Sequence, residues 1–90
     1  MPWVYPSELL EALLDFGLSP TSASPPVLVR DALSDLYRYE LRRLRDRLRE
    51  GEVAKPDYIG LVIATRKKYW PLTMMPKVWE RICQVLIPNS

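Results

Sequence analysis

The chain has 90 residues, the size of a single domain, and a formal net charge of only +2. It contains one cysteine, Cys83, and no histidine, which excludes an intrachain disulfide, a cysteine-rich metal site and the Ser–His and Cys–His nucleophile pairs. No segment has about 18 uninterrupted apolar residues, and no basic stretch precedes an apolar one near the start. We therefore expect a cytoplasmic protein that is not an enzyme, with no catalytic residues, cofactor, metal ion, small-molecule substrate or membrane partner.

The charges are distributed unevenly along the chain. Residues 1–37 contain one basic residue and five acidic residues, whereas residues 38–90 contain twelve basic and six acidic residues. Nine of the thirteen basic residues are arginine, which pairs with carboxylate or phosphate groups through two parallel hydrogen bonds. The two halves either complement each other within the molecule, or the basic half binds an acidic partner.

Residues 1–6 are predicted to form an extended N-terminal arm, because prolines flank its two aromatic residues, Trp3 and Tyr5. The arm either lies over the apolar surface of the domain or docks on a second copy or another partner. Trp3 and Tyr5 are therefore candidate partner-binding residues.

A first helix is predicted to begin at Ser7, whose side chain can cap it, and to end at Gly17. Its leucines fall on one side of the helix. The segment from Leu18 to Pro26 is rich in serine and proline and is predicted to be a loop. The buried side of the first helix is predicted to consist of Leu9, Leu10, Leu13 and Leu14.

A long central helix is predicted over residues 25–50, with Ser24 as its cap, Pro25 in its first turn and Gly51 after its end. At about 100° per residue, five apolar residues share an arc of roughly 80° that should face the core. They are Leu33, Tyr37, Leu41, Leu44 and Leu48.

Four arginines, Arg38, Arg42, Arg45 and Arg49, cluster on a second arc of the same helix, about 120° from the apolar one. They could bind phosphates or an acidic protein surface. Alternatively, ion pairs with Asp35 and Asp46 on neighbouring turns could neutralise much of this charge.

Two pairs of acidic residues, Glu8 with Glu11 and Asp31 with Asp35, are each predicted to share a helical face. Asp31 and Asp35 are four residues apart, so both carboxylates project from one side. We expect them to be solvated rather than catalytic.

The segment 57–70 is harder to assign, because its β-branched residues would also suit a buried strand. Its length and the absence of an obvious partner strand favour a helix capped by Asp57. Its apolar residues cover more than half of the circumference, which is typical of a helix that is central or that is half core and half interface. Arg66, Lys67 and Lys68, followed by Tyr69 and Trp70, combine basic groups with flat rings, a mixture that can hold single-stranded nucleic acid. The three basic residues would point in different directions, however, and they also suit the last helical turn.

Pro71 ends that helix, and a last short helix is predicted to start between Thr73 and Pro76. Trp70, Met74 and Met75 lie around this turn and form either a corner of the core or a binding patch. Residues 87–90 are predicted to be a loose tail. The buried side of the last helix is predicted to contain Val78, Trp79, Ile82, Val85 and Leu86.

The sequence thus predicts one all-α domain over residues 1–90, a three- to four-helix bundle around one long central helix. The favoured function is a protein-interaction domain: an adaptor, an accessory subunit or a self-associating unit. The alternative is a nucleic-acid-binding domain that uses the basic half from Arg38 to Lys68.

Overall fold

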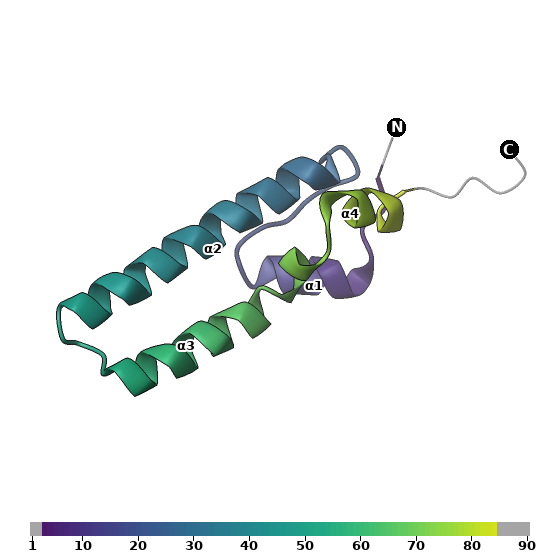
Figure 1. Ribbon diagram of the computed structural model, residues 1–90. Helices are drawn as coiled ribbons and strands as arrows, with labels where there is room; N and C mark the ends of the chain where they lie inside the picture. Colours follow the sequence, from purple (N-terminus) through teal and green to yellow (C-terminus); the bar gives the residue numbers. More distant parts are fainter. Residues whose placement is uncertain (1–2, 85–90) are drawn as a thin grey trace, which may run out of the picture.

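A computed structural model of the chain describes residues 3–84 and shows an all-α fold within them. Figure 1 shows α2 and α3 as a long antiparallel hairpin, with the shorter helices gathered at its open end. The predicted all-α bundle with one long helix is therefore confirmed. The elements are α1 (Ser7–Leu14), α2 (Pro26–Arg49), α3 (Lys55–Lys68), the 3-10 helix η1 (Trp70–Thr73) and α4 (Pro76–Ile82).

Prolines set the helix starts. α2, α3 and α4 each have a proline in the first turn, where the missing N–H costs no hydrogen bond and the fixed φ suits a helix. The predicted side-chain caps are wrong for this reason. Pro6, Pro25 and Ala54 occupy the N-cap positions, whereas Ser7 and Asp57 lie inside their helices, and the Ser24 hydroxyl accepts a hydrogen bond from the Thr21 N–H (3.0 Å).

Glycines follow the ends of the first two helices, as predicted. Gly17 and Gly51 have φ values of +75° and +78°, a left-handed conformation that strains other residues. Beside Gly51, the Glu52 N–H donates to the carbonyl of Arg47, which closes the end of α2. The chain then reverses over residues 50–54, so α3 runs back along α2 (Figure 1).

The segment that could have been a strand is the helix α3, which confirms the favoured interpretation. The residues of α3 and of the turn after it are divided between two environments. Thr65 and the following Tyr69 are buried against neighbouring elements, whereas Ile59 and Ile63 are 54% and 49% exposed. α3 therefore contributes little to the core, and much of its apolar surface is free of the other described elements.

The core lies where α1 and α4 meet the first half of α2. Trp79 is fully buried, and its indole N–H donates to the carbonyl of Pro71 (2.9 Å), which fixes α4 against η1. Phe16 and Tyr37 pack on the ring of Tyr69, with centroids 4.2 and 5.1 Å away. The core residues are Tyr5, Leu9, Leu13, Leu33, Tyr69, Trp79 and Cys83.

The predicted buried sides of the short helices are only partly correct. In α1, Leu9 and Leu13 are buried but Leu14 is exposed. In α4, Trp79 is buried as predicted, whereas Ile82 faces outward and Cys83 takes the inner position. The predictions for Val85, Leu86 and the tail 87–90 lie outside the described residues.

The N-terminal segment covers the core. The Trp3 N–H donates to the carbonyl of Ser22 (2.7 Å), and the Val4 N–H donates to the carbonyl of Cys83 (2.8 Å). The buried Tyr5 hydroxyl donates to the carbonyl of Ser24 (2.6 Å). Of the two interpretations of this arm, the structure supports the one in which it lies over the domain's own apolar surface.

Replacement of Trp79 by alanine should be among the most destabilising single changes. It removes a fully buried ring and leaves a cavity, so we expect the free energy of unfolding to fall by about 3–5 kcal/mol. Trp79→Phe keeps most of the ring but leaves the Pro71 carbonyl without its donor, a loss of about 1–3 kcal/mol. Urea unfolding followed by circular dichroism measures both. Equal stability of Trp79→Phe and the unaltered protein would contradict the role of this hydrogen bond.

Alkaline pH should destabilise the fold through Tyr5. Burial, with a smaller contribution from Cys83, raises the pKa of Tyr5 to about 12, whereas the unfolded chain has a tyrosine pKa of about 10. The native state therefore holds its proton more tightly, and this stabilisation is complete below about pH 10 and lost as the pH rises through about 12. Urea unfolding between pH 9 and about 11 should show a steeper decline for the unaltered protein than for Tyr5→Phe. Tyr39→Phe, at an exposed position, is the control and should keep the steep decline.

Candidate protein interface

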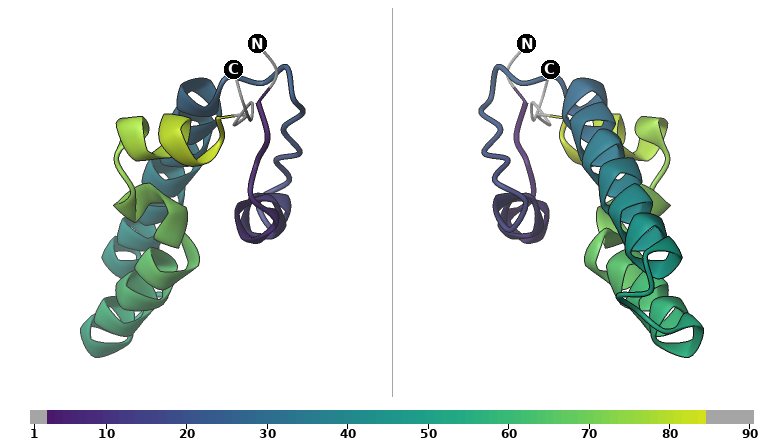
Figure 2. Two further views of the ribbon diagram at one scale, coloured as in Figure 1. Left: turned by 90° about the vertical axis from the view of Figure 1, so that its right-hand side faces the viewer. Right: turned by 90° about the vertical axis from the view of Figure 1, so that its left-hand side faces the viewer.

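The far half of the α2–α3 hairpin extends beyond the helical cluster that encloses the core. Figures 1 and 2 show only these two helices at the closed end of the hairpin. The sides of α2 and α3 that face each other are covered. Leu44 is buried on the facing side of α2, and Val53 is buried at the turn between the helices. The flanks of the helical pair are left exposed because no third described element covers them.

A groove runs along one flank of this hairpin, between α2 and α3. Its volume is about 450 Å³. The residues at its centre are apolar and half-buried, and those at its edges are exposed arginines from both helices. The central residues are Leu41, Tyr58 and Val62, and the arginines are Arg38, Arg42, Arg45 and Arg66.

Helical geometry explains why these residues meet. Arg38, Arg42 and Arg45 are separated by four and three residues, so they follow one another along the edge of α2. Their aliphatic stems can lie along the apolar centre while the guanidinium groups stay in water. Arg66 joins them from α3 because the helices are antiparallel.

Among the described residues, most of these arginines have no acidic partner. Arg38 contacts Asp35 (3.4 Å) and donates to the Ser34 hydroxyl (3.2 Å), which confirms one of the predicted local ion pairs. The predicted pairs of Asp46 with Arg42 and Arg49 do not form. Within residues 3–84, no carboxylate forms an ion pair with Arg42, Arg45 or Arg66.

The apolar part of this flank continues onto the outer side of α3. Ile59 and Ile63 are four residues apart and lie next to Arg66 on the helix surface. Both are about half exposed. We call the groove together with Ile59 and Ile63 the hairpin groove; it combines an apolar strip with a row of arginines.

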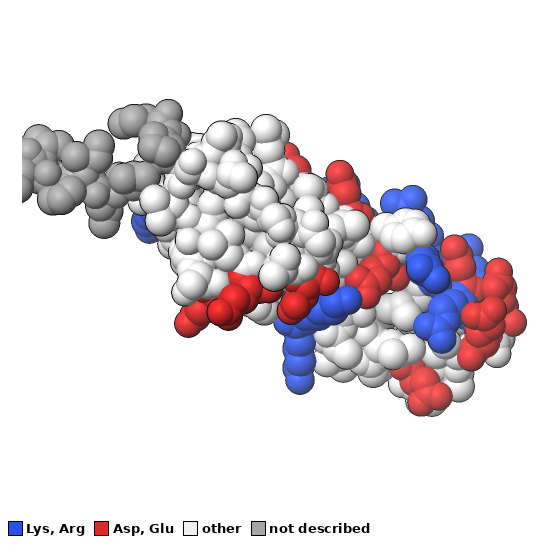
Figure 3. All heavy atoms as spheres, turned by 180° about the vertical axis from the view of Figure 1, so that it is seen from behind, with Lys and Arg blue, Asp and Glu red and all other residues white. Residues whose placement is uncertain are grey.

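The other basic residues lie on different surfaces. Lys68 pairs with Glu40 (3.3 Å) and its ammonium group lies 5.2 Å from the ring centre of Phe16. Lys67 and Trp70 border a hollow whose other wall is the acidic side of α1. Part of the charge asymmetry is thus balanced within the molecule. Figure 3 shows basic side chains gathered over the hairpin half, interspersed with acidic ones.

The remaining candidate residues do not join the hairpin groove. Arg49 is exposed at the end of α2, outside the groove lining. Trp3 is half-buried and Tyr5 is buried, so within one copy neither is available as a docking anchor. Around η1, Met74 is half-buried, whereas Trp70 and Met75 are 39% and 69% exposed, so that corner is partly core and partly surface.

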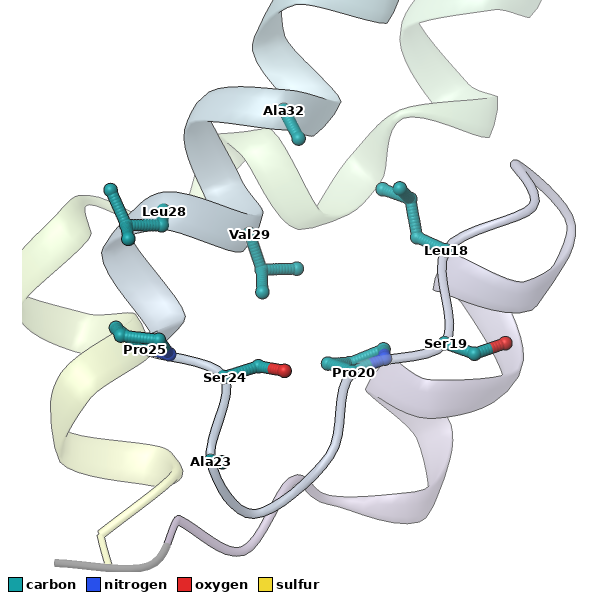
Figure 4. A pocket seen from close by; sticks show the side chains of 9 residues that line it. All are labelled: Leu18, Ser19, Pro20, Ala23, Ser24, Pro25, Leu28, Val29 and Ala32. Atoms are coloured by element: carbon teal, nitrogen blue, oxygen red, sulfur yellow. The ribbon is translucent and has the colours of Figure 1, made fainter.

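A second hollow, of about 470 Å³, lies beside the 18–25 loop. Figure 4 shows side chains from this loop and from the start of α2 around it. Its lining contains no charged residue, so it offers little to fix the orientation of a ligand. The lining residues are Leu18, Ser19, Pro20, Ala23, Ser24, Pro25, Leu28, Val29 and Ala32.

Two polar groups of the core are held in their neutral forms. Burial raises the pKa of the Cys83 thiol, which disfavours the nucleophilic thiolate. Burial, and then the hydrogen bond to Glu40, raise the pKa of Tyr69. Both groups therefore act as parts of the packing. Over residues 3–84 no group of three or more potential metal ligands occurs, and no helix there is long and apolar enough to cross a membrane.

Comparison with known proteins adds no information on function. No protein-family model matches the chain, and neither a curated protein nor a solved structure matches it. The hairpin groove must therefore be interpreted from its own chemistry.

Sequence reasoning found the arginines of α2 but not the groove. It grouped Arg66 with Lys67 and Lys68, because these residues adjoin in sequence, and did not connect Arg66 with α2. The short connection after Gly51 was the available signal, since two helices joined by so few residues must be antiparallel neighbours.

The clustered guanidinium groups should reduce stability in the isolated chain. Arg42→Gln/Arg45→Gln removes two like charges that have no carboxylate partner, so we expect an increase of about 0.3–0.5 kcal/mol in the free energy of unfolding at low salt. Arg38→Gln is the control, because it also loses the contact with Asp35. Urea unfolding at low and high salt tests this. A double variant less stable than the unaltered protein would contradict the repulsion.

Proposed function

We propose that the protein is a non-enzymatic protein-interaction domain whose hairpin groove binds an acidic surface of a partner protein. One observation carries the proposal: guanidinium groups without a carboxylate partner surround an exposed apolar strip. Clustered like charge and exposed aliphatic side chains both disfavour the isolated molecule. Clustered arginines next to exposed aliphatic side chains are typical of a protein interface.

The arginines and the apolar strip of the groove together determine which type of partner can bind. Arginine pairs with carboxylates through a planar fork, and this pairing gains strength where apolar contacts exclude water. Leu41, Val62 and Ile63 offer contacts that only apolar side chains can match. An acidic amphipathic segment satisfies both requirements at once.

The nucleic-acid alternative is less consistent with the charge arrangement. A backbone of phosphates is bound by a continuous track of basic groups. Here Lys68 pairs with Glu40 and Lys67 lies beside the acids of α1, so the basic half is divided between separate surfaces. The groove lining contains a single aromatic ring, that of Tyr58, whereas single strands are bound by successive stacking rings.

Binding of a defined acidic peptide tests the proposal. The probe is a fluorescein-labelled amphipathic peptide of about 15 residues, leucine-rich on one side and glutamate-rich on the flank, compared with a version carrying glutamine in place of glutamate. Arg42→Glu/Arg45→Glu should weaken binding of the acidic peptide at least about tenfold in fluorescence anisotropy. Lys67→Glu/Lys77→Glu makes the same change in net charge elsewhere on the exposed surface and should bind nearly as the unaltered protein does.

Two results would contradict this function. Equal losses in the two variants would mean that net charge, not the groove, attracts the peptide. Tighter binding of a single-stranded oligonucleotide, with a steep dependence on salt, would favour the nucleic-acid alternative.

A further inference from the structure

The outer face of α2 reverses its charge along the helix. At about 100° per residue, two aspartates and four arginines fall within one arc of roughly 80°, which lies roughly 150° from the buried Leu33 and Leu44. The aspartates come first and the arginines follow. This outer stripe consists of Asp31, Asp35, Arg38, Arg42, Arg45 and Arg49, all of them exposed.

No described element covers the outer stripe. In Figure 1, α2 forms the upper edge of the molecule, and α1, α3, η1 and α4 all lie below it. The stripe extends along most of α2, which as a 24-residue helix is about 36 Å long.

A helix with one acidic and one basic half is complementary to itself when two copies run antiparallel. With a two-fold axis near residue 38, Arg45 of one copy lies opposite Asp31 of the other, and Arg42 opposite Asp35. The aspartates are four residues apart and the arginines three, so both pairs are spaced by about one helical turn, 5–6 Å. Because of the two-fold symmetry, the Arg45–Asp31 pair and the Arg42–Asp35 pair each occur twice in the dimer.

The residues at the centre and the ends of this arrangement are compatible with it. Arg38 falls at the axis, where two copies of it approach, and it is the arginine whose charge Asp35 of its own helix already offsets. At each end, Arg49 lies opposite Leu28, which is 62% exposed and can pack under the arginine stem. The register therefore leaves one like-charged contact, Arg38 with Arg38 at the axis, and on each side of it Asp35 is shared between Arg38 of its own helix and Arg42 of the other copy.

Ion pairs on a surface contribute little alone, typically about 0–1 kcal/mol each. The hairpin groove adjoins the arginine half of the stripe, since Arg38, Arg42 and Arg45 belong to both. The acidic half of the second α2 would therefore lie along the groove edge and shield its apolar strip from water. Apolar contacts supply affinity in this arrangement, and the charges select the antiparallel orientation.

We propose that the partner surface bound at the hairpin groove is a second copy of this chain, paired antiparallel through the outer stripe of α2. This inference rests on the proposed function and identifies its acidic surface as Asp31 and Asp35 of the other copy. A foreign acidic protein is the occupant if the test below fails.

Charge exchange between two variants tests the pairing. Asp31→Arg/Asp35→Arg makes the stripe entirely basic, and Arg42→Glu/Arg45→Glu makes it acidic at four of its six positions, with Arg38 and Arg49 unchanged. Each variant alone should be monomeric, because its own copies repel. A mixture of the two should form a one-to-one heterodimer, because the opposed positions 31 and 45, and 35 and 42, then carry opposite charges. Light scattering after size-exclusion chromatography measures the masses, and the unaltered protein should be a dimer whose dissociation constant rises with salt.

Matched variants control for net charge and folding. Lys67→Glu/Lys77→Glu and Glu50→Arg/Glu80→Arg change the charge equally at exposed positions off the stripe, and both should remain dimers. Circular dichroism confirms that each variant is helical. An unaltered protein that stays monomeric, or a mixture that does not associate, would overturn the pairing. If Arg42→Glu/Arg45→Glu still loses the acidic peptide, the proposed function survives that result with a foreign partner.

Discussion

The length of α2 is the constraint on which the rest of the structure depends. The helix has 24 residues, about 36 Å, whereas α1, η1 and α4 form a cluster around its first half only. The second half must find other cover, and α3 provides it on one side. The hairpin, its exposed flank and the hairpin groove all follow from one helix that is longer than the core it crosses.

The two halves of α2 also differ in role. The first half contributes to the stability of the core, and the second half carries the candidate interface. The first half holds Leu33 against the tightly packed residues around Trp79. In the second half only Leu44 is fully covered, and arginines surround the remaining apolar residues. A chain of 90 residues buries a modest core, so it has little stability to offset unpaired like charges. In the proposed function, a partner surface supplies the missing carboxylates.

The sequence was sufficient for features that depend on neighbouring residues. The apolar arc of α2 was predicted correctly, as were the glycines at 17 and 51 and the helical state of most of 57–70. The caps were mispredicted, because prolines can begin a helix without any side-chain hydrogen bond. Ile82 was misplaced because α4 has only seven residues, and so short a helix gives a weak apolar pattern.

The groove depended on tertiary structure and could be predicted only in part. The arginines of α2 formed a visible stripe, but their position beside Val62 and Arg66 follows from how α3 pairs with α2. Likewise, the two interpretations of Tyr5 could not be separated until its contact with Ser24 placed it in the core. Asp31 and Asp35 were predicted to share a face of this helix, but they were not placed on the arc of the arginines.

Distances between spin labels on paired copies test the central claim most directly. In a Cys83→Ala background, a single label is placed at the exposed Tyr39, near the proposed axis, or at the exposed Glu50, near the end of the hairpin. Antiparallel pairing through α2 predicts a separation within about 20 Å between labels at position 39 and about 35 Å between labels at position 50. Short distances at both positions would indicate parallel pairing, and the absence of any distance between copies would show that the outer stripe does not bind a second copy; either result contradicts the account.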